Sequence, residues 1–406
     1  MNGKEKLAQY TAELHESLWA LALYLYENPE IGFREYKSSH ALTEFLKAHG
    51  FEQVSLGVGG LDTAFIASAC PSGVKEPHVD ILAEYDALDL GRVNGKENMV
   101  AHACGHNIIA STGVGAAVSL LKLMKEEKIP GTLRIVGTPA EENGGGKIIL
   151  QNAGVFKDTD FMILLHPTSG TSKIAGRCKS IFKIRAIYHG RSAHAGNHRE
   201  QGINAQDAAV ICYTAIGCLR YRLMDDMQVF AQIQNLPDTT GIIPDYAEVS
   251  ITARCFKKTD LDRVIPQIKN CVQAGALASG CSVEMEERAP YYGRVCYHTL
   301  ETVLRKNFAL LGEEILPGMV DDSGGEDFGN LIRKVPGIMP YPSLCLSHRV
   351  SLHTLDYLEL VHSRRAKEVV LLGSRVMAYT VLDVLQDASI ILAAKAELAE
   401  MNRHEM

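Results

Sequence analysis

The stretch His102-Ala103-Cys104-Gly105-His106-Asn107 decides which fold and chemistry are expected of this chain. It lies between an apolar, strand-like run at 78–83 and a run at 108–126 rich in Ala, Gly and Ser, which predicts a closely packed helix. A thiolate and an imidazole one residue apart at a helix start can bind one divalent cation, and together they suit zinc and its neighbours. An isolated Cys-Gly-His is more often a pair of core residues. Further ligands are therefore expected at nearby strand ends.

The bulk properties describe an ordinary globular protein. A length of 406 residues exceeds what one core usually holds, so two domains are expected. A net charge of −7 argues against a nucleic-acid partner. We find no apolar run of membrane-spanning length and no apolar signal segment at the start. The ten cysteines are scattered without a CxxC pair, which predicts reduced thiols in a cytoplasmic protein.

The first part of the chain alternates between strand and helix patterns. Near-continuous apolar strands are typical of a sheet buried on both faces. The alternation predicts an α/β domain with a central, largely parallel sheet flanked by helices. The predicted strands are 63–67, 78–83, 132–137 and 161–165, and the predicted helices are 7–26, 37–49, 108–126 and 147–152.

The pattern changes near residue 175. Strands at 180–188, 228–234, 247–256 and 282–287 and helices at 204–223 and 261–279 follow in the order strand, helix, strand, strand, helix, strand. This order predicts an inserted α+β, ferredoxin-like domain with an antiparallel sheet. We place it at 178–292, so that 1–177 and 293–406 form the catalytic domain. The latter segment ends in a long helical region at 356–400.

More metal-binding side chains follow the predicted strands. Glu141 and Glu142 come directly after 132–137, where one carboxylate can bind metal and its neighbour can carry a proton. His166 follows 161–165, and His353 lies in a region that would fold back onto the first domain. Together with Cys104 and His106 these are too many ligands for one tetrahedral ion and suit a two-metal site. A solvated acidic turn and structural histidines are the alternatives.

Several motifs, in order along nearly the whole chain, resemble one family. It is the family of metal-dependent amidohydrolases and peptidases that includes aminoacylases, carnosine-type dipeptidases and bacterial glutamate carboxypeptidase. The likeness is strongest to the branch with aminobenzoyl-glutamate hydrolase and β-alanyl-lysine dipeptidase. The motifs are YDAL at 85–88, HACGHN at 102–107, GTPAEE at 137–142, HP at 166–167, GRSAHA at 190–195, IPDYAEV at 243–249, EDFGN at 326–330 and VPGI at 335–338.

The resemblance implies a role for each matching residue. It implies two divalent ions in each protomer, zinc or manganese with cobalt or nickel as substitutes, bridged by Cys104. Glu141 would be the general base, Asp86 would orient the site, and Arg254 would bind the substrate carboxylate. The inserted domain would serve as a dimerisation and lid domain, and its His194 would cross the homodimer interface to stabilise the oxyanion of the partner's site. The metal ligands would be Cys104, His106, Glu142, His166 and His353.

This sequence departs from the family pattern at a few positions. Glu84 stands where other branches have a histidine ligand, and we leave it out of the predicted ligand set. Asn107 replaces the aspartate that is common after Cys-Gly-His, and Gly241 replaces an asparagine that often helps to hold the substrate. The Gly324-Gly325-Glu326-Asp327 run also differs from a serine-threonine-aspartate run in near relatives, and its role stays open.

The expected function is that of a cytoplasmic, homodimeric amidohydrolase or dipeptidase. It would hydrolyse the amide of an N-acyl amino acid or dipeptide with a free C-terminal carboxylate, using metal-activated water, and would have no nucleic-acid or membrane partner. The alternative enzyme is an aminobenzoyl-glutamate hydrolase acting on folate fragments. Less favoured are an inactive metal-binding scaffold and a phosphate-binding protein that uses Gly144-Gly145-Gly146, which lacks the GxxxxGK[ST] spacing.

Overall fold

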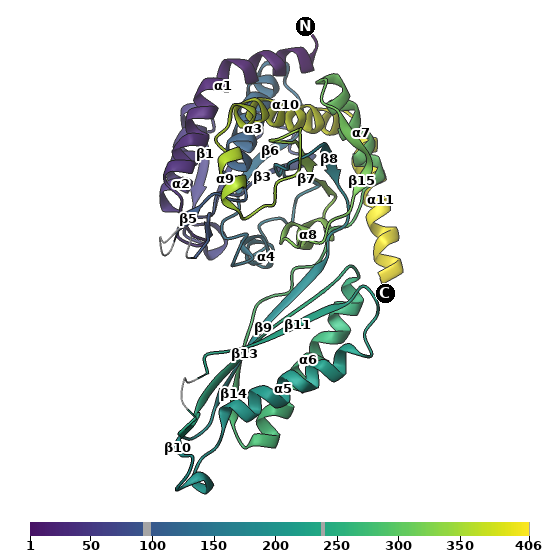
Figure 1. Cartoon of the computed structure of the whole chain (residues 1–406). Helices are drawn as coiled ribbons and strands as arrows, with labels where there is room; N and C mark the ends of the chain where they lie inside the picture. Colours follow the sequence, from purple (N-terminus) through teal and green to yellow (C-terminus); the bar gives the residue numbers. More distant parts are fainter. Residues whose placement is uncertain (92–98, 237–239, 406) are drawn as a thin grey trace.

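Figure 1 shows the computed structural model of the chain, which describes residues 1–91, 99–236 and 240–405. The larger body contains both chain ends, and a narrower body, which we call the distal unit, projects from it. Each body has its own cluster of buried apolar side chains. The larger cluster draws on both ends of the chain, whereas the smaller one lies within residues 182–281.

A six-stranded sheet forms the centre of the larger body in the described part of the chain. Its strand order is β1-β2-β6-β3-β7-β16, in which β6, β3, β7 and β16 are parallel, β2 is antiparallel to β6, and the edge strand β1 is antiparallel to β2. The predicted largely parallel sheet is therefore confirmed. The strands are β1 (Gln53–Leu56), β2 (Phe65–Ala69), β3 (His78–Ala83), β6 (Thr132–Gly137), β7 (Phe161–Ile163) and β16 (Gly337–Ile338).

Helix α3 (His106–Glu127) packs against β3 and is covered by α1 (Gly3–Glu27) and α10 (Arg364–Gln386). Its small residues permit this close packing. A Cβ on Gly115 would lie 2.4 Å from the Ser374 Oγ of α10, and one on Gly113 would lie 3.3 Å from the Leu82 carbonyl oxygen of β3. The Ala-, Gly- and Ser-rich run is thus explained by contacts on both sides of the helix.

By length and composition, α3 also passes for a membrane span, although 94% of that stretch is buried inside the protein. Our expectation that no apolar run reaches such a length is therefore wrong for this helix. Among the described helices, α10 and α11 (Ala388–Glu405) have the length and composition of a membrane span only when they are taken together, and the chain bends by 95° between them. A helix buried on all sides by its own protein is apolar for packing reasons.

The distal unit is an antiparallel sheet with two helices on one face. Its strand order is β11-β13-β9-β14, and α5 and α6 pack against it, which confirms the predicted α+β arrangement. A short antiparallel pair, β10 with β12, lies at the end far from the larger body, where Figure 1 labels β10. The elements are β9 (Ser180–His189), β10 (Ala193–His194), α5 (Ala205–Arg220), β11 (Gln228–Gln234), β12 (Ile242–Ile243), β13 (Tyr246–Cys255), α6 (Lys258–Ser279) and β14 (Ser282–Glu287).

Two chain passages join the bodies, and they contact each other closely. A Cβ on Gly293 would lie 2.0 Å from the Cys178 carbonyl oxygen. Beside them, the buried Arg294 donates hydrogen bonds to the Gly176 carbonyl oxygen at 2.8 Å and to the Glu326 carboxylate at 2.7 Å. The joint is therefore a pair of closely packed extended segments connected by the hydrogen bonds of a buried arginine, and not a loose linker.

The rest of the larger body was predicted less well. The segment 356–400 is not one helix, because α9 (Leu355–Leu360) ends before Ser363 and the Ser363 side chain caps α10. The sequence patterns also missed short strands that pair only with distant parts of the chain. The remaining elements are β4 (Leu88–Asp89), β5 (Val100–Ala101), β8 (Ser172–Ala175), β15 (Ile315–Val320), β17 (Pro340–Tyr341), α2 (Tyr36–Ala48), α4 (Gly146–Asn152), α7 (His298–Leu310) and α8 (Phe328–Ile332).

Candidate active site

The carboxyl ends of three neighbouring parallel strands supply most of the predicted site. Asp86 follows β3, Glu141 and Glu142 follow β6, and His166 follows β7. The start of α3, which packs over β3, brings Cys104 to the same edge. In open parallel sheets this edge is where ligands bind.

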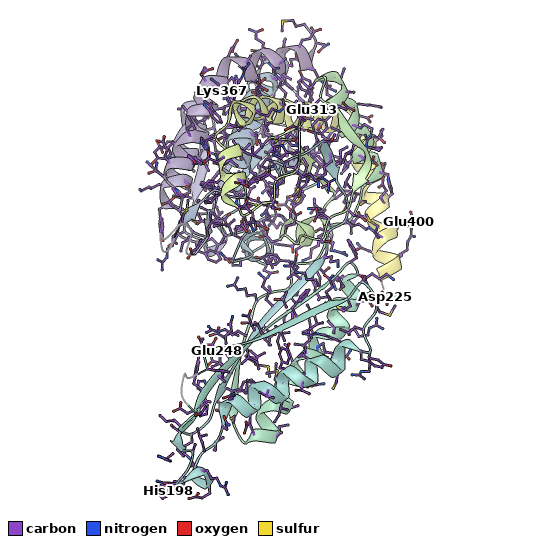
Figure 2. All side chains as sticks on the ribbon, viewed as in Figure 1. His198, Asp225, Glu248, Glu313, Lys367 and Glu400 are labelled. Carbon is purple, nitrogen blue, oxygen red and sulfur yellow. The ribbon has the colours of Figure 1, made fainter. Side chains whose placement is uncertain are left out.

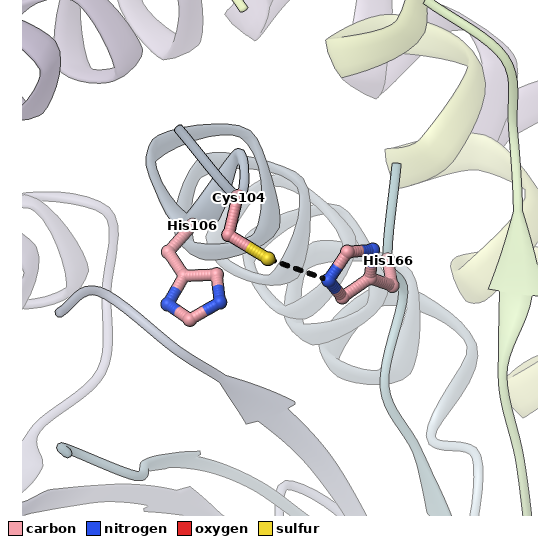
Figure 3. A group of neighbouring side chains, drawn as sticks. All are labelled: Cys104, His106 and His166. Carbon is pink, nitrogen blue, oxygen red and sulfur yellow. Dashed lines mark hydrogen bonds between the residues drawn. The ribbon is translucent and has the colours of Figure 1, made fainter. Parts of the chain in front are cut away.

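All five predicted metal ligands lie together. The Cys104 Sγ is 3.4 Å from the His166 Nε2, and His106 faces the same space (Figure 3). The Glu142 Oε1 is 3.7 Å from the His106 Nε2 and 3.6 Å from the His353 Nε2. His353 arrives from a distant segment, and its backbone N–H donates to the Ala103 carbonyl oxygen at 3.0 Å.

Asp86 holds two of these residues in position. Its Oδ1 lies 2.9 Å from the His106 Nδ1, and its Oδ2 accepts the Glu142 backbone N–H at 3.0 Å. The contact to Nδ1 turns the Nε2 of His106 toward the centre of the site. Burial alone would raise the pKa of Asp86, but the His106 imidazole lowers it, so the carboxylate stays charged.

The donor atoms fit divalent cations. Cys104, His106 and His166 form one group of potential ligands, and Cys104, Glu142 and His353 form another, with the ligand atoms of each group within 4.8 Å of one another. The two groups share the cysteine sulfur. In the described part of the chain, the buried His106 Nε2 and Glu142 Oε1 have no hydrogen-bond partner. Buried polar atoms without partners are costly unless they bind something, and this mixed set suits zinc or a neighbouring metal.

Glu141 is placed next to this centre by a strained backbone. The preceding residue, Ala140, has a φ of 58°, and its N–H donates at 2.8 Å to the buried carboxylate of Glu35. Tyr291 donates a hydrogen bond to the Glu141 carbonyl oxygen at 3.1 Å. Burial, followed by the charge of Glu142, raises the pKa of Glu141 well above its usual value. A carboxyl group in such surroundings can both accept and return a proton.

A buried ionic network beside the ligands was not predicted. The Lys147 Nζ lies 2.6 Å from the Glu84 Oε1 and 2.6 Å from the Asp327 Oδ1, and all three side chains are buried. The other Glu84 oxygen, Oε2, faces the His106 Nε2 at 3.5 Å. Glu84 was left out of the predicted set, although its place two residues before Asp86 was the signal that could have included it.

The three glycines before this lysine do not form a phosphate loop. A Cβ on Gly146 would lie 1.8 Å from the Pro139 carbonyl oxygen, and one on Gly144 would lie 2.2 Å from the Phe33 ring. Lys147, which a phosphate loop would need to expose, is fully buried in its ion pairs. Close backbone packing explains the glycines, so we discard the phosphate-binding alternative.

A cavity of about 450 Å³ opens onto the site from the distal unit. Glu141, Glu142 and His353 line one side, and Arg254 of β13 lines the other. The Arg254 Nη1 lies 3.4 Å from the Ser323 carbonyl oxygen, a long contact that leaves the guanidinium open to the cavity. The volume suits a small substrate.

His194 lies apart from these residues. It is exposed in β10, at the far tip of the distal unit, and His198, labelled in Figure 2, marks the same tip. Its Nδ1 accepts backbone N–H groups of Gly196 and Asn197 at 3.1 and 3.2 Å, which leaves Nε2 pointing outward as the available ring nitrogen. The structure therefore brings together every predicted site residue of this chain except His194.

Known proteins resemble this chain over most of its length. A family model described as peptidase family M20/M25/M40 matches residues 78–355. The Xaa-Arg dipeptidase of Mus musculus is 32% identical over 407 residues, covering 97% of this chain and 91% of that protein. A chain of the p-aminobenzoyl-glutamate hydrolase of Escherichia coli K12 is 29% identical over 65% of this chain and 56% of that protein. A solved dinuclear metal-binding peptidase from Bacillus subtilis has a TM-score of 0.67 at 21% identity, over 92% of this chain and 99% of that one.

Proposed function

Because this chain belongs to peptidase family M20/M25/M40 and is a metal-dependent hydrolase, we propose that it cleaves the amide bond of an N-acyl amino acid or dipeptide with a free carboxylate. The family resemblance and the fold class predicted from the order of strands and helices are thereby confirmed. One observation carries the substrate proposal. A single cavity is lined by Glu141 and two of the proposed ligands, Glu142 and His353, on one side and by Arg254, which has no carboxylate partner in the described chain, on the other.

In this proposal, two divalent ions are held by Cys104, His106, Glu142, His166 and His353. Two groups of potential ligands, which share Cys104, support this proposal because each group would hold one ion. When bound, such ions polarise the scissile carbonyl and make water more acidic. Asp86 fixes the orientation of His106 and the backbone of Glu142, so it acts as a positioning residue.

Glu141 carries the proton in this proposal. It accepts a proton from the attacking water and donates it to the leaving nitrogen, a task that needs a pKa near the working pH. Burial and the charge of Glu142 raise its pKa, which makes its carboxylate a stronger base than an exposed glutamate, and this supports the role. Arg254 binds the substrate carboxylate, for which its planar guanidinium is suited.

We propose residues 178–292 as an inserted domain that covers the site and joins two protomers. The position of β10, at the end of the distal unit far from the larger body (Figure 1), supports a role for His194 in a partner's active site and not in its own. Its outward Nε2 is suited to stabilise an oxyanion. The ten free cysteines support a reducing, cytoplasmic location.

The test combines metal content with turnover. Wild type and Cys104→Ala are purified without added metal, reconstituted with zinc or manganese, and measured by elemental analysis. We expect close to two ions per wild-type chain and a large loss in the variant, with hydrolysis of at least one N-acyl amino acid or dipeptide by the wild type. A folded wild type that binds no metal after reconstitution would refute the ligand assignment, and metal without hydrolysis would favour an inactive scaffold.

An aminobenzoyl-glutamate hydrolase remains the second candidate. The similarity to the E. coli hydrolase chain supports it. It would share the metal centre and Glu141 and differ in the acyl group. Turnover of aminobenzoyl-glutamate measured beside a dipeptide panel separates the two.

A further inference from the structure

Three cationic side chains lie on one face of the distal sheet. Lys183 of β9 pairs directly with Thr252 of β13, so Arg254, two residues further along β13, points to the same face. Arg288 follows β14, and its N–H donates to the Lys183 carbonyl oxygen at 3.3 Å, which continues the strand pairing. The opposite face is apolar and packs against α5 and α6. We call Lys183, Arg254 and Arg288 the cationic wall.

The cationic wall faces the site. All three side chains line the cavity of about 450 Å³ that also contains Glu141 and His353. Those two residues come from the larger body, so the wall stands opposite the metal-binding side chains. A substrate whose amide bond lies at Glu141 must therefore extend toward these cations.

Among the described residues, no carboxylate forms an ion pair with a member of the cationic wall. The next cation on the same strand face, Arg185, differs in this respect. Its guanidinium lies 2.9 Å from Glu286 and 3.5 Å from Glu248, which is labelled in Figure 2. Partial desolvation in the cavity and the two arginines of the wall lower the pKa of Lys183. Glu141 and Glu142 line the same cavity and oppose this shift, but neither forms an ion pair with the wall in the described chain. Like charges gathered without ion-pair partners favour an anionic ligand.

We propose that the cationic wall binds two carboxylates of one substrate, so the amino acid released by the enzyme is acidic. Arg254 binds the α-carboxylate, and Lys183 with Arg288 binds the side-chain carboxylate of a glutamate or aspartate. An α-carboxylate bound by Arg254 alone would leave Lys183 and Arg288 without an anionic partner. A released amino acid with a cationic side chain would instead add a fourth positive charge. This inference rests on the proposed function and narrows it to N-acyl or aminoacyl conjugates of acidic amino acids.

The proposal predicts a measurable ratio of kcat/KM between a glutamate conjugate and the matching glutamine conjugate. One acyl group that supports turnover is attached to L-glutamate, to its neutral isostere L-glutamine and to L-arginine. We expect kcat/KM for the glutamate conjugate to exceed that for the glutamine conjugate by at least about tenfold, as for a charged hydrogen bond, with the arginine conjugate poorest. In Lys183→Met and Arg288→Gln the glutamate-to-glutamine ratio should fall toward one. Arg185→Gln is the matched control and should keep the wild-type ratio.

Product binding separates this inference from the proposed function. Thermal unfolding of the metal-loaded protein is measured with free L-glutamate, L-glutamine and L-arginine. Greater stabilisation by glutamate, lost in Arg288→Gln but retained in Arg185→Gln, would support the cationic wall even if no conjugate were hydrolysed. A wild type that turns over the glutamine or arginine conjugate as well as the glutamate conjugate would refute the wall and leave the amidohydrolase standing.

Discussion

Replacing Lys147 with methionine tests the buried ionic network beside the metal-binding residues. The Lys147 ammonium lies 2.6 Å from both the Glu84 and the Asp327 carboxylates, and none of the three side chains is exposed by more than a few per cent. Methionine has a similar length, so the main change is the loss of charge. Asp327 would then be buried without a charged side-chain partner and Glu84 would keep only His106, and breaking a buried ion pair in this way costs about 3–5 kcal/mol. We expect the unfolding free energy of Lys147→Met to fall by an amount in this range.

The loss should depend on pH in a defined direction. Burial raises the pKa of Asp327 to about 6 even though Lys147 lowers it, so removal of the lysine raises this pKa further. A carboxyl group with a raised folded-state pKa is destabilising above that pKa, and the penalty disappears as the pH falls. The difference between wild type and Lys147→Met should therefore be largest near pH 8 and smaller near pH 5.

The assay is urea unfolding of chelated, metal-free protein, followed by tryptophan fluorescence. Trp19 is the single tryptophan and packs in α1 against the core of the larger body, so it reports on the body that contains Lys147. The control is Lys122→Met, whose ion pair with Glu13 is half exposed and should contribute less than about 1 kcal/mol. Equal losses in the two variants near pH 8 would refute the argument that burial makes the Lys147 network strong.

Three further predictions concern the residues around the reaction. Glu141→Gln should keep its metal by elemental analysis while kcat falls by roughly a hundred- to ten-thousand-fold, and unchanged turnover would exclude Glu141 as the base. Because burial raises the pKa of Glu35 to about 7, wild-type stability should fall as the pH rises from about 5 to about 7. Unfolding measured at several pH values should show a smaller dependence on pH in Glu35→Gln. An unchanged pH dependence in this variant would contradict the assignment to Glu35. His194→Ala mixed with an equal amount of Glu141→Gln and allowed to exchange protomers should recover roughly a quarter of wild-type activity, because half of the dimers are mixed and each has one complete site. No recovery, with exchange verified, would argue against a shared active site.

Much of the fold follows from local pattern. The ends of β3, β6, β11 and β14 agree with the predicted strands, because apolar runs bounded by turn residues mark them clearly. The break between α9 and α10 was missed because a single serine cap is a weak signal within a helical composition. The three short strands β8, β15 and β17 pair only with segments far away in sequence, so no local periodicity reveals them.

The residues of the site also divide into those that local sequence patterns could predict and those that they could not. Residues that stand in motifs, such as Cys104 and Glu142, could be proposed from spacing and resemblance. Lys147 and Asp327 are 180 residues apart, and an ion pair across such a separation leaves no pattern in one sequence. The cationic wall depends on the register between β9, β13 and β14, which fixes which alternate side chains share a face. Register and long-range pairing are therefore what the sequence alone could not supply.

The separation of the site between two bodies has an evolutionary consequence. Cys104, Glu141 and their buried supports belong to the larger body, whereas Lys183, Arg254 and Arg288 are on a sheet with its own apolar core. Mutations on the open face of that sheet can alter the charge presented to a ligand without disturbing any of the proposed metal ligands. Substitution of a few residues on this face can thus change substrate preference during evolution while the residues proposed for catalysis stay the same. Relatives with the same metal-binding residues are expected to differ most at positions 183 and 288.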